Sequence, residues 1–443
     1  MYRLIYEQLK KWKKDKNKKP LVFQGARQVG KTYLITQFGK KEYQDFIYLN
    51  FEQDEELSDL FAGNLQVENI LKKISLYIGK KIKPDNTLLF FDEIQAAPRV
   101  LTSLKYFQEA ASEYHIIAAG SLLGVSVAKQ GSFPVGKVNF MYMYPMNFME
   151  YLLANGQNLL VEELTTRQEI SNFPEPIHNK LIEYYKEYLF VGGMPEAVKA
   201  YVQKKDVREV RKIQNELLAA YRRDFSKYAD AKQAVKTLEL WQSIPFQLAR
   251  ENKKFKYSDV RKNARAAVYE QTIEWLKGAG LINVAYNISA AKLPLSGYTD
   301  YSKFKIYFSD TGLLGAMLNL SSKTIIEPDA VFKQYNGAFI ENYVAQELVC
   351  ADWSLYYWTS KSDAEVDFIL EKENKLYPME VKSGTSLNLK SLQSYALKYN
   401  PDLLFRVSPR NFITRAKFIN IPLYALTPVL NNWSKSRLKI RNN

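Results

Sequence analysis

Short apolar runs that end in glycine or polar residues recur in the N-terminal third of the chain and predict buried strands. Such runs occupy residues 21–23 and 88–91, and another lies within residues 115–124. Between them, residues 33–38 predict a helix, and residues 47–61 predict a strand, an acidic loop and a helix. Alternating strands and helices with polar strand ends predict an α/β fold with a doubly wound parallel sheet.

The middle of the chain has a different pattern, in which helical periodicity dominates. The pattern is helical from residue 157 to about residue 228, and residues 256–288 predict two helices and then an alternating strand, as in a winged helix. In this segment Arg261, Lys262 and Arg265 are candidates to face DNA phosphates. A purely structural helix-turn-helix connector would have the same pattern.

The last third of the chain predicts two strands joined by a short turn. Residues 364–370 and 377–384 are largely apolar, and the segment EKENK between them is typical of a β-hairpin turn. A helix is expected to follow at residues 390–399. This region therefore differs from the N-terminal third, where helices separate the strands.

Composition limits the classes of protein to which the chain can belong. The 443 residues include 62 Lys and Arg against 47 Asp and Glu, a formal net charge of +15. This charge favours a polyanionic partner, most simply DNA, although a solvated basic surface is the alternative. Apolar runs are too short to cross a membrane, so no membrane partner is expected. With Cys350 as the single cysteine and only two histidines, a disulfide framework and cysteine-based zinc sites are excluded, which favours a cytoplasmic location.

The segment GARQVGKT lies between the strand at 21–23 and the helix at 33–38, and it matches the G-x-x-x-x-G-K-[ST] pattern of a phosphate-binding loop. Its glycines let main-chain N–H groups converge on an anion, and the following helix N-terminus adds partial positive charge. We expect Lys31 to act as a catalytic group on the β- and γ-phosphates of ATP, and Thr32 to ligate Mg²⁺. The expected nucleotide-binding residues of the loop are Gly25, Ala26, Arg27, Gln28, Val29, Gly30, Lys31 and Thr32.

Two acidic residues after the strand at 88–91 complete this nucleotide site. Asp92 is expected to hold Mg²⁺, usually through its water shell, and Glu93 to polarise the attacking water as a catalytic residue. Ser121 follows Gly120 at the end of another strand, where a polar residue can touch the γ-phosphate. A simple strand-to-turn exit would look the same, and the sequence does not distinguish ATP from GTP.

Polar residues on the predicted hairpin form a second candidate centre. Glu380 and Lys382 share one face of their strand because side chains alternate in direction, and Asp367 can meet them from the neighbouring strand. Two carboxylates such as Asp367 and Glu380 suit Mg²⁺, which activates a water and stabilises phosphate charge. Lys382 can orient that water or neutralise the oxyanion. All three are therefore candidate catalytic residues.

Taken together, these motifs resemble a known family. The segments GARQVGKT, FDEIQ and GSLLG…SFPVGKV occur here in the order found in archaeal-type AAA ATPases of the signal-transduction P-loop class. The segments YLFVGGMPEAV, YFSDTGLL and FIENYVAQEL resemble the C-terminal domain of unknown function attached to those ATPases. The resemblance covers nearly the whole chain and implies ATP binding and hydrolysis.

The D…E-x-K arrangement of the last third is similar to the PD-(D/E)xK nuclease fold. This resemblance implies an α/β restriction-nuclease-like domain and adds Glu341, on a preceding helix, as a metal ligand, with Glu347 the less suitable position. The expected domains are a P-loop AAA-type ATPase domain (1–155), a helical lid or linker (156–235), a winged-helix-like region (236–320) and a nuclease-like domain (321–443).

Two functions remain open from the sequence. The chain is either an ATP-regulated enzyme acting on DNA, or a nucleotide-dependent switch whose C-terminal domain binds DNA or protein without cleavage. A third function, a ring-forming homo-oligomeric motor, would need arginines that act across subunits. Arg222 and Arg223 are candidates for this role, although a basic helix face explains them equally well, and Lys137 stands where related ATPases often have arginine.

Overall fold

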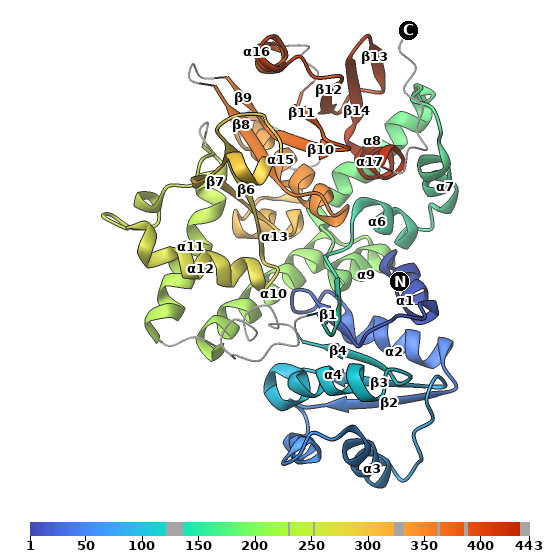
Figure 1. Cartoon of the computed structure of the whole chain (residues 1–443). Helices are drawn as coiled ribbons and strands as arrows, with labels where there is room; N and C mark the ends of the chain where they lie inside the picture. The colour runs from blue at the N-terminus through green and yellow to red at the C-terminus, as the bar shows by residue number, and fades with distance from the viewer. Residues whose placement is uncertain are drawn as a thin grey trace. The chain divides into compact units, whose positions relative to one another are not determined.

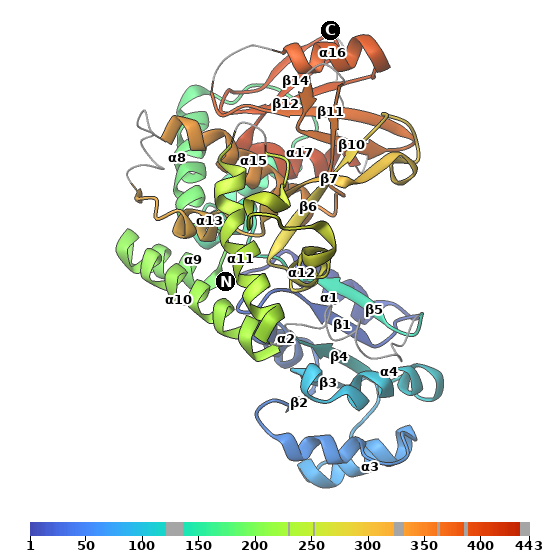
Figure 2. The same cartoon turned by 90° about the vertical axis from the view of Figure 1, so that its left-hand side faces the viewer.

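The computed structural model describes residues 1–120, 136–228, 231–250, 253–322, 332–360, 364–384 and 389–434. The chain divides into two compact units, coloured blue to cyan and green to red in Figures 1 and 2. The first unit comprises Met1–Tyr144 with Gly278–Gly280, and the second comprises Pro145–Lys277 with Leu281–Asn443.

The first unit alternates strands with helices along the chain. Its strands are β1 (Leu21–Gln24), β2 (Asp45–Asn50), β3 (Thr87–Asp92), β4 (His115–Ala119) and β5 (Asn139–Tyr142). Its helices are α1 (Ile5–Lys14), α2 (Lys31–Glu42), α3 (Val67–Ile78) and α4 (Pro98–Ala110), with 3-10 turns η1 (Glu55–Phe61) and η2 (Ile94–Ala96).

The five strands of this unit form one sheet in the order β2-β3-β4-β1-β5, and every neighbouring pair is parallel. Helix α2 contacts β2, β3 and β4, whereas η1, α3 and α4 build an apolar cluster with the opposite face. The predicted α/β fold with a parallel sheet between helices is therefore confirmed. Parallel strands place all their carboxyl ends at one edge, where ligands bind in such folds.

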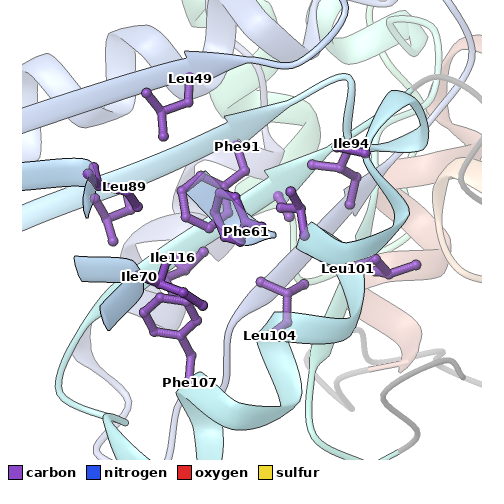
Figure 3. Close-up of a cluster of buried hydrophobic side chains, with 14 of the residues drawn as sticks. Leu49, Phe61, Ile70, Leu89, Phe91, Ile94, Leu101, Leu104, Phe107 and Ile116 are labelled. Atoms are coloured by element: carbon purple, nitrogen blue, oxygen red, sulfur yellow. The ribbon is translucent and has the colours of Figure 1, made fainter. Parts of the chain in front are cut away.

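That apolar cluster fixes the position of β3 (Figure 3). Leu89 and Phe91, two residues apart on the strand, pack with Phe61 and with Phe107 of α4, and all four side chains are fully buried. Burying each side chain of this size stabilises the fold by about 1.5–3 kcal/mol. The carboxyl end of β3, where Asp92 lies, is thereby held next to the rest of the sheet edge.

The second unit is a helical assembly combined with two sheets. Its helices are α6 (Phe148–Ala154), α7 (Asn158–Thr166), α8 (Glu175–Val191), α9 (Pro195–Lys204), α10 (Val207–Tyr228), α11 (Ala231–Leu248), α12 (Ala266–Gly278), α13 (Thr311–Met317), α15 (Phe332–Cys350), α16 (Lys390–Tyr399) and α17 (Leu426–Ser434). Its strands are β6 (Ile282–Ile288), β7 (Thr299–Phe308), β8 (Tyr356–Thr359), β9 (Glu365–Val366), β10 (Phe368–Lys372), β11 (Lys375–Val381), β12 (Leu404–Ser408), β13 (Ile413–Arg415) and β14 (Phe418–Pro422). Within the described ranges of the whole chain, no helix is long and apolar enough to cross a membrane.

The strands of the second unit pair in the orders β7-β6-β8-β9 and β10-β11-β12-β14-β13. The predicted hairpin is present: β10 and β11 are antiparallel, with Phe368 opposite Met379. Glu373 and Asn374 at its turn both have left-handed φ angles, 50° and 60°, which suits a two-residue hairpin loop. Parallel pairing of β11 with β12 and of β12 with β14 extends the hairpin into a mixed sheet.

A pair of glycines between α8 and α9 allows a close approach of two segments. Gly192 has a φ of 72°, and a β-carbon on Gly193 would collide with the main chain of Met146. The Gly193 amide donates to Asp310 at 2.5 Å, and the other Asp310 oxygen accepts from the Leu313 amide at 2.9 Å and caps α13. The segments VGGMPEAV and SDTGLL therefore have a structural role in this unit.

The winged-helix-like segment differs from the sequence expectation at its start. Residues Tyr257–Asp259 form a 3-10 turn (η3) instead of a helix, and α12 begins only at Ala266. Asp259 forms an ion pair with Arg250 at 2.5 Å, and Asn263 interrupts helical geometry with a φ of 67°. Helices α11 and α12 and the antiparallel pair β6–β7 remain, and the winged-helix description stays a prediction.

Candidate nucleotide site and a second acidic centre

The loop from Gly25 to Gly30 connects the end of β1 to the start of α2 in the first unit. Three residues of the loop have positive φ angles: Gly25 at 150°, Gln28 at 65° and Gly30 at 96°. A chain that turns this sharply directs successive main-chain N–H groups inward, and Lys31 opens the helix whose N-terminus follows. The backbone therefore has the form of an anion cradle.

Gly25 is required by the space around it as well as by its φ angle. A β-carbon at this position would collide with the main-chain oxygen of Met143. Met143 is held in place because its amide donates to the carbonyl of Gln24 at 2.8 Å. The first glycine of the motif thus lets the loop pass against the segment that follows β5.

Lys31 lies inside the loop that it follows. Its ammonium group donates to the carbonyls of Gly25 at 2.8 Å and Ala26 at 2.9 Å, and the residue is 7% exposed. Burial lowers the pKa of Lys31 to about 8, against the opposing effect of the nearby Glu93 and Asp92 carboxylates. The position suits a lysine that contacts the phosphates of a nucleotide lying in the loop.

Thr32 and Asp92 meet at the edge of the sheet. The Thr32 hydroxyl donates to Asp92 Oδ2 at 2.7 Å, and the Tyr48 hydroxyl reaches the same oxygen at 3.2 Å. Burial raises the pKa of Asp92, and the hydrogen bond from Thr32 opposes this rise. A hydroxyl and a carboxylate at this distance are hard oxygen ligands of the type that Mg²⁺ prefers, so the residues fit this ion.

Glu93 follows Asp92 in an unusual backbone conformation. Its φ is 51°, and its amide donates to Asp92 Oδ1 at 3.0 Å. Gln95 donates from its side-chain nitrogen to Glu93 Oε2 at 2.5 Å, which holds the carboxylate in one orientation. A non-glycine residue in the left-handed region carries strain, and strain of this kind collects at functional sites. Ser121, the remaining predicted nucleotide contact, lies outside the described residues.

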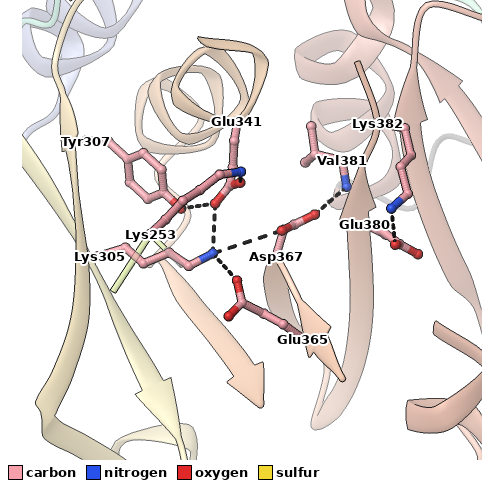
Figure 4. Close-up of polar contacts among 9 residues, drawn as sticks. All are labelled: Lys253, Lys305, Tyr307, Glu341, Glu365, Asp367, Glu380, Val381 and Lys382. Carbon is pink, nitrogen blue, oxygen red and sulfur yellow. Dashed lines mark hydrogen bonds and ion pairs between the residues drawn. The ribbon is translucent and has the colours of Figure 1, made fainter. Parts of the chain in front are cut away.

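The second centre lies in the second unit and is built around Lys305 of β7 (Figure 4). The Lys305 ammonium lies 2.8 Å from Glu341 Oε1, 2.5 Å from Glu365 Oε1 and 4.0 Å from Asp367 Oδ1. Its side chain is 0% exposed, so the carboxylates and not water stabilise its positive charge. Lys305 thus lies close to Glu341 and Asp367, two of the carboxylates predicted to ligate a metal, and to Glu365.

Two further groups complete the contacts of Glu341, which is itself almost fully buried on α15. Lys253 forms a hydrogen-bonded ion pair with Glu341 Oε2, and the Tyr307 hydroxyl donates to Glu341 Oε1 at 2.5 Å. Burial alone would raise the pKa of Glu341, but the ammonium groups of Lys253 and Lys305 outweigh burial and lower it. Burial and the Glu341 charge raise the pKa of Asp367.

Glu380 and Lys382 form a separate pair at the end of β11. Their side chains point toward each other, with Lys382 Nζ 2.6 Å from Glu380 Oε1 (Figure 4). Asp367 reaches β11 only through the Val381 amide, which donates to Asp367 Oδ2 at 2.8 Å. Among the described residues, no ion pair or hydrogen bond joins Glu380 or Lys382 to the Lys305 cluster. No group of three or more acidic, histidine or cysteine side chains is placed to hold a metal ion in these ranges.

Comparison with known proteins agrees with the geometry of the first unit. Residues 17–152 match the family model described as an AAA domain. We refer to residues 17–152 as the AAA domain after this match. Residues 182–324 and 336–426 match two domains of unknown function, DUF8612 and DUF4143.

Two curated relatives are uncharacterized proteins. One, from Methanocaldococcus jannaschii, is 27% identical over 243 residues, which cover 49% of this chain and 50% of the relative. The other, from Mycobacterium tuberculosis, is 32% identical over 95 residues, 21% of each chain. The chain therefore matches about half or less of the length of these relatives.

Solved structures with low similarity include a Walker-type ATPase of Pyrococcus abyssi, with 13% identity, a TM-score of 0.45, and coverage of 71% of this chain and 94% of that one. AMPPCP-bound DnaA from Aquifex aeolicus has 15% identity and a TM-score of 0.29, with coverage of 62% and 87%. The ORC1 protein of Aeropyrum pernix, in complex with DNA, has 10% identity and a TM-score of 0.32, with coverage of 72% and 93%. At these TM-scores the likenesses add nothing to what the residues of this chain indicate.

Sequence reasoning brought together the loop, Asp92 and Glu93 of the AAA domain, and the structure places them at one sheet edge. In the second unit it missed Lys253, Lys305 and Glu365. A signal for Lys305 was present, because a lysine within the apolar segment FKIYF is unusual in a buried strand. Glu365 was also detectable, since it precedes Asp367 by two residues.

Proposed function

We propose that the protein is a Mg²⁺-dependent ATPase whose AAA domain is coupled to a nuclease-like C-terminal domain that acts on DNA. The observation that carries the ATPase proposal is the 2.7 Å contact between Thr32 and Asp92 beside the Gly25–Lys31 loop. Thr32 follows the loop after β1, whereas Asp92 ends β3, and this meeting of two oxygen groups at one edge of the parallel sheet supports the proposal.

Each residue of the candidate nucleotide site has a defined role in this proposal. The loop amides and Lys31 bind the phosphates of ATP, and Thr32 with Asp92 would hold Mg²⁺, which neutralises phosphate charge when bound. Glu93 orients the attacking water and accepts its proton, and Gln95 keeps the Glu93 carboxylate in position. The nucleotide would thereby be held with its γ-phosphate facing Glu93.

The DNA part of the proposal rests on charge and on the C-terminal sequence pattern. The net charge of +15 suits a polyanionic partner, and the hairpin with Asp367, Glu380 and Lys382 is the part that resembles a nuclease. A single cysteine, Cys350, suits a reducing cytoplasm. Arg222 and Arg223 of α10 are exposed and available for a contact across subunits in a homo-oligomer.

The test is ATP turnover with Mg²⁺, with and without DNA, in wild type and Glu93→Gln. We expect Glu93→Gln to lower turnover by roughly 100-fold or more while ATP still binds, because the base is lost and the cradle is intact. Glu113→Gln, an exposed residue before β4, is the matched control and should keep full turnover. Equal turnover in Glu93→Gln and wild type would overturn the assignment of the base.

A second candidate function for the C-terminal domain is binding without cleavage, and Lys305 favours it. The ammonium group lies between Glu341, Glu365 and Asp367 and neutralises them from within the chain. A divalent ion would have to displace this buried cation before it reached the carboxylates. The separation of the Glu380–Lys382 pair from this cluster points in the same direction.

DNA cleavage assays with Mg²⁺ and Mn²⁺ decide between the two functions. Cleavage by wild type that disappears in Asp367→Ala, with ATP turnover unchanged, establishes the nuclease. Absence of cleavage in a preparation that turns over ATP and binds DNA establishes the binding function. Glu371→Ala, on the exposed part of β10, is the control for a nonspecific effect of losing a carboxylate near the hairpin.

A further inference from the structure

A cavity of about 520 Å³ opens in the second unit between α11 and the start of α12. Residues of α11, of the connecting loop and of α12 line it. It is remote in sequence from Lys305 and its carboxylates, and none of its lining residues belongs to that cluster. Two of its lining residues, Arg261 and Lys262, are among the residues that the sequence suggests for contact with DNA phosphates.

The charges around this cavity are strongly unequal. Lys232 and Lys236 lie one helical turn apart on α11 and therefore share a face, and Arg261 with Lys262 supplies the other side. Glu239 is the single acidic residue of the lining. Its carboxylate accepts from the Tyr269 hydroxyl at 2.7 Å and lies 3.8 Å from Arg261, so its charge is compensated within the wall.

Apolar surface lies among these cations. Val235 is 56% exposed and Val268 is 39% exposed, although both are large hydrophobic residues that usually avoid water. An inorganic anion would use the cations and leave the valines wet. A ligand that uses both must carry repeated negative charge together with apolar surface, as a nucleic-acid strand does with its phosphates, sugars and bases.

We infer that this cavity binds a single strand of DNA, with its phosphates on Lys232, Lys236 and Lys262 and its sugars or bases on Val235 and Val268. The volume is in the range of small-molecule sites, enough for about one or two nucleotides of a flexible strand. A duplex is too wide to enter and could only lie across the mouth. Cationic walls with apolar contacts are the general design of sites for single strands. This inference rests on the proposed action on DNA and assigns the contact with DNA to this cavity.

The test measures binding of a fluorescein-labelled single-stranded oligonucleotide to the full-length protein over a series of salt concentrations. The variant is Lys232→Ala/Lys236→Ala/Lys262→Ala. Its matched control is Lys40→Ala/Lys72→Ala/Lys180→Ala, which removes the same charge from exposed positions on α2, α3 and α8. Val235→Glu is a further variant, because it keeps every cation and adds a negative charge inside the cavity.

We expect the cavity variant to lose at least about 30-fold in affinity and to reduce the salt slope by about 2 to 3, one for each lost phosphate contact. The control should lose much less, and Val235→Glu should weaken binding by about 10-fold or more. Circular dichroism shows that each variant keeps its fold, and ATP turnover shows that its nucleotide site is intact.

Four results would overturn the inference. Equal losses in the cavity variant and the control would show that DNA binds elsewhere, and the proposed action on DNA would survive. If duplex DNA binds more tightly than single-stranded DNA, and the cavity variant loses affinity for duplex to the same extent, the occupant is duplex and not a single strand. Polyglutamate bound at the cavity in place of DNA would make it a site for acidic peptide. If wild type binds no DNA even at low salt, the proposed function fails together with the inference.

Discussion

The two acidic centres of this protein contain similar residues in opposite electrostatic states. In the AAA domain, Asp92 accepts hydrogen bonds from two neutral hydroxyls, and Lys31 donates to main-chain carbonyls of its own loop. In the second unit, Lys305 binds Glu341 and Glu365 directly. In the first centre the lysine and the carboxylate each form hydrogen bonds to neutral groups, whereas in the second centre the lysine neutralises the carboxylates.

This difference shows why a list of acidic and basic residues does not define a metal site. A carboxylate pair attracts a cation of some kind, and a buried ammonium group satisfies it as well as a metal does. In the second centre, the ammonium group of Lys305 offsets the free-energy cost of removing the carboxylates from water. In the first centre, hydroxyl groups offset the corresponding cost for Asp92, and hydroxyl oxygens also suit the coordination of an added ion.

The largest effect is expected when the cation of the second centre is removed. Lys305→Met leaves the buried Glu341 and the largely buried Asp367 without their shared cation, so we expect a loss of about 3–5 kcal/mol in the free energy of unfolding. Urea unfolding monitored by circular dichroism measures it. Lys303→Met on the same strand removes an exposed ion pair with Asp300 and should cost less than about 1 kcal/mol. Similar values for the two variants would contradict a structural role for Lys305.

Removal of the lysine from the first centre should weaken ligand binding and leave stability intact, the opposite of the effect expected for Lys305. Lys31→Met is expected to weaken ATP binding by roughly 10- to 100-fold, since a charged hydrogen bond to phosphate is lost. Stability should be unchanged or raised, because burial already disfavours the charged form and lowers the pKa of Lys31 to about 8. Isothermal titration with ATP and thermal melting test the two statements, with the exposed Lys40→Met as control. A strong loss of stability in Lys31→Met would make the two centres alike.

Helix α15 carries a second buried glutamate that sharpens the contrast. Glu347 accepts from the Phe148 amide at 2.9 Å and from the Thr427 hydroxyl, with no lysine beside it among the described residues, and burial raises its pKa to about 7. Because this folded-state pKa is above the unfolded value, the stability that Glu347 contributes is full below about pH 4.5 and is lost as the pH rises through about 7.

Glu347→Gln keeps the neutral form at every pH. At about pH 8.5 the variant should exceed wild type by about 2–3 kcal/mol, and at about pH 5 the two should agree within about 1 kcal/mol. Urea unfolding at both pH values measures the difference. Glu341→Gln provides the contrast, since lysines lower the pKa of Glu341 and its loss should destabilise the protein at both pH values. A pH-independent difference between Glu347→Gln and wild type would refute the predicted titration.

The smallest effect is expected at the outer lysine of the second centre. Lys253 is bound to Glu341 but its side chain is 19% exposed, and Lys305 remains in place when it is lost. We expect Lys253→Met to reduce the free energy of unfolding by about 1–2 kcal/mol, less than Lys305→Met. The exposed Lys256→Met is the control. If Lys253→Met costs more than Lys305→Met, the centre depends on its rim and not on its buried cation.

Much of the first unit could be predicted because its signals are local. The glycines of the loop, the apolar strand before Asp92 and the helix after Lys31 are each encoded within a few residues, and parallel strands have one common carboxyl edge. The hairpin of the second centre was predictable for the same reason, since a short turn joins its two strands. The helix expected at the start of the winged-helix-like segment is absent, because this stretch forms a 3-10 turn and Asn263 has a left-handed φ angle.

The sequence by itself determined the parallel α/β sheet, the phosphate loop and the presence of carboxylates on a C-terminal hairpin. Only the tertiary structure decided which cation those carboxylates meet. Lys305 and Glu341 are 36 residues apart, and Lys253 and Glu341 are 88 apart. Contacts over such distances depend on how β7 packs against α15 and on the sheet order β7-β6-β8-β9. No local pattern records that packing, so the charge state of the second centre is a property of the fold.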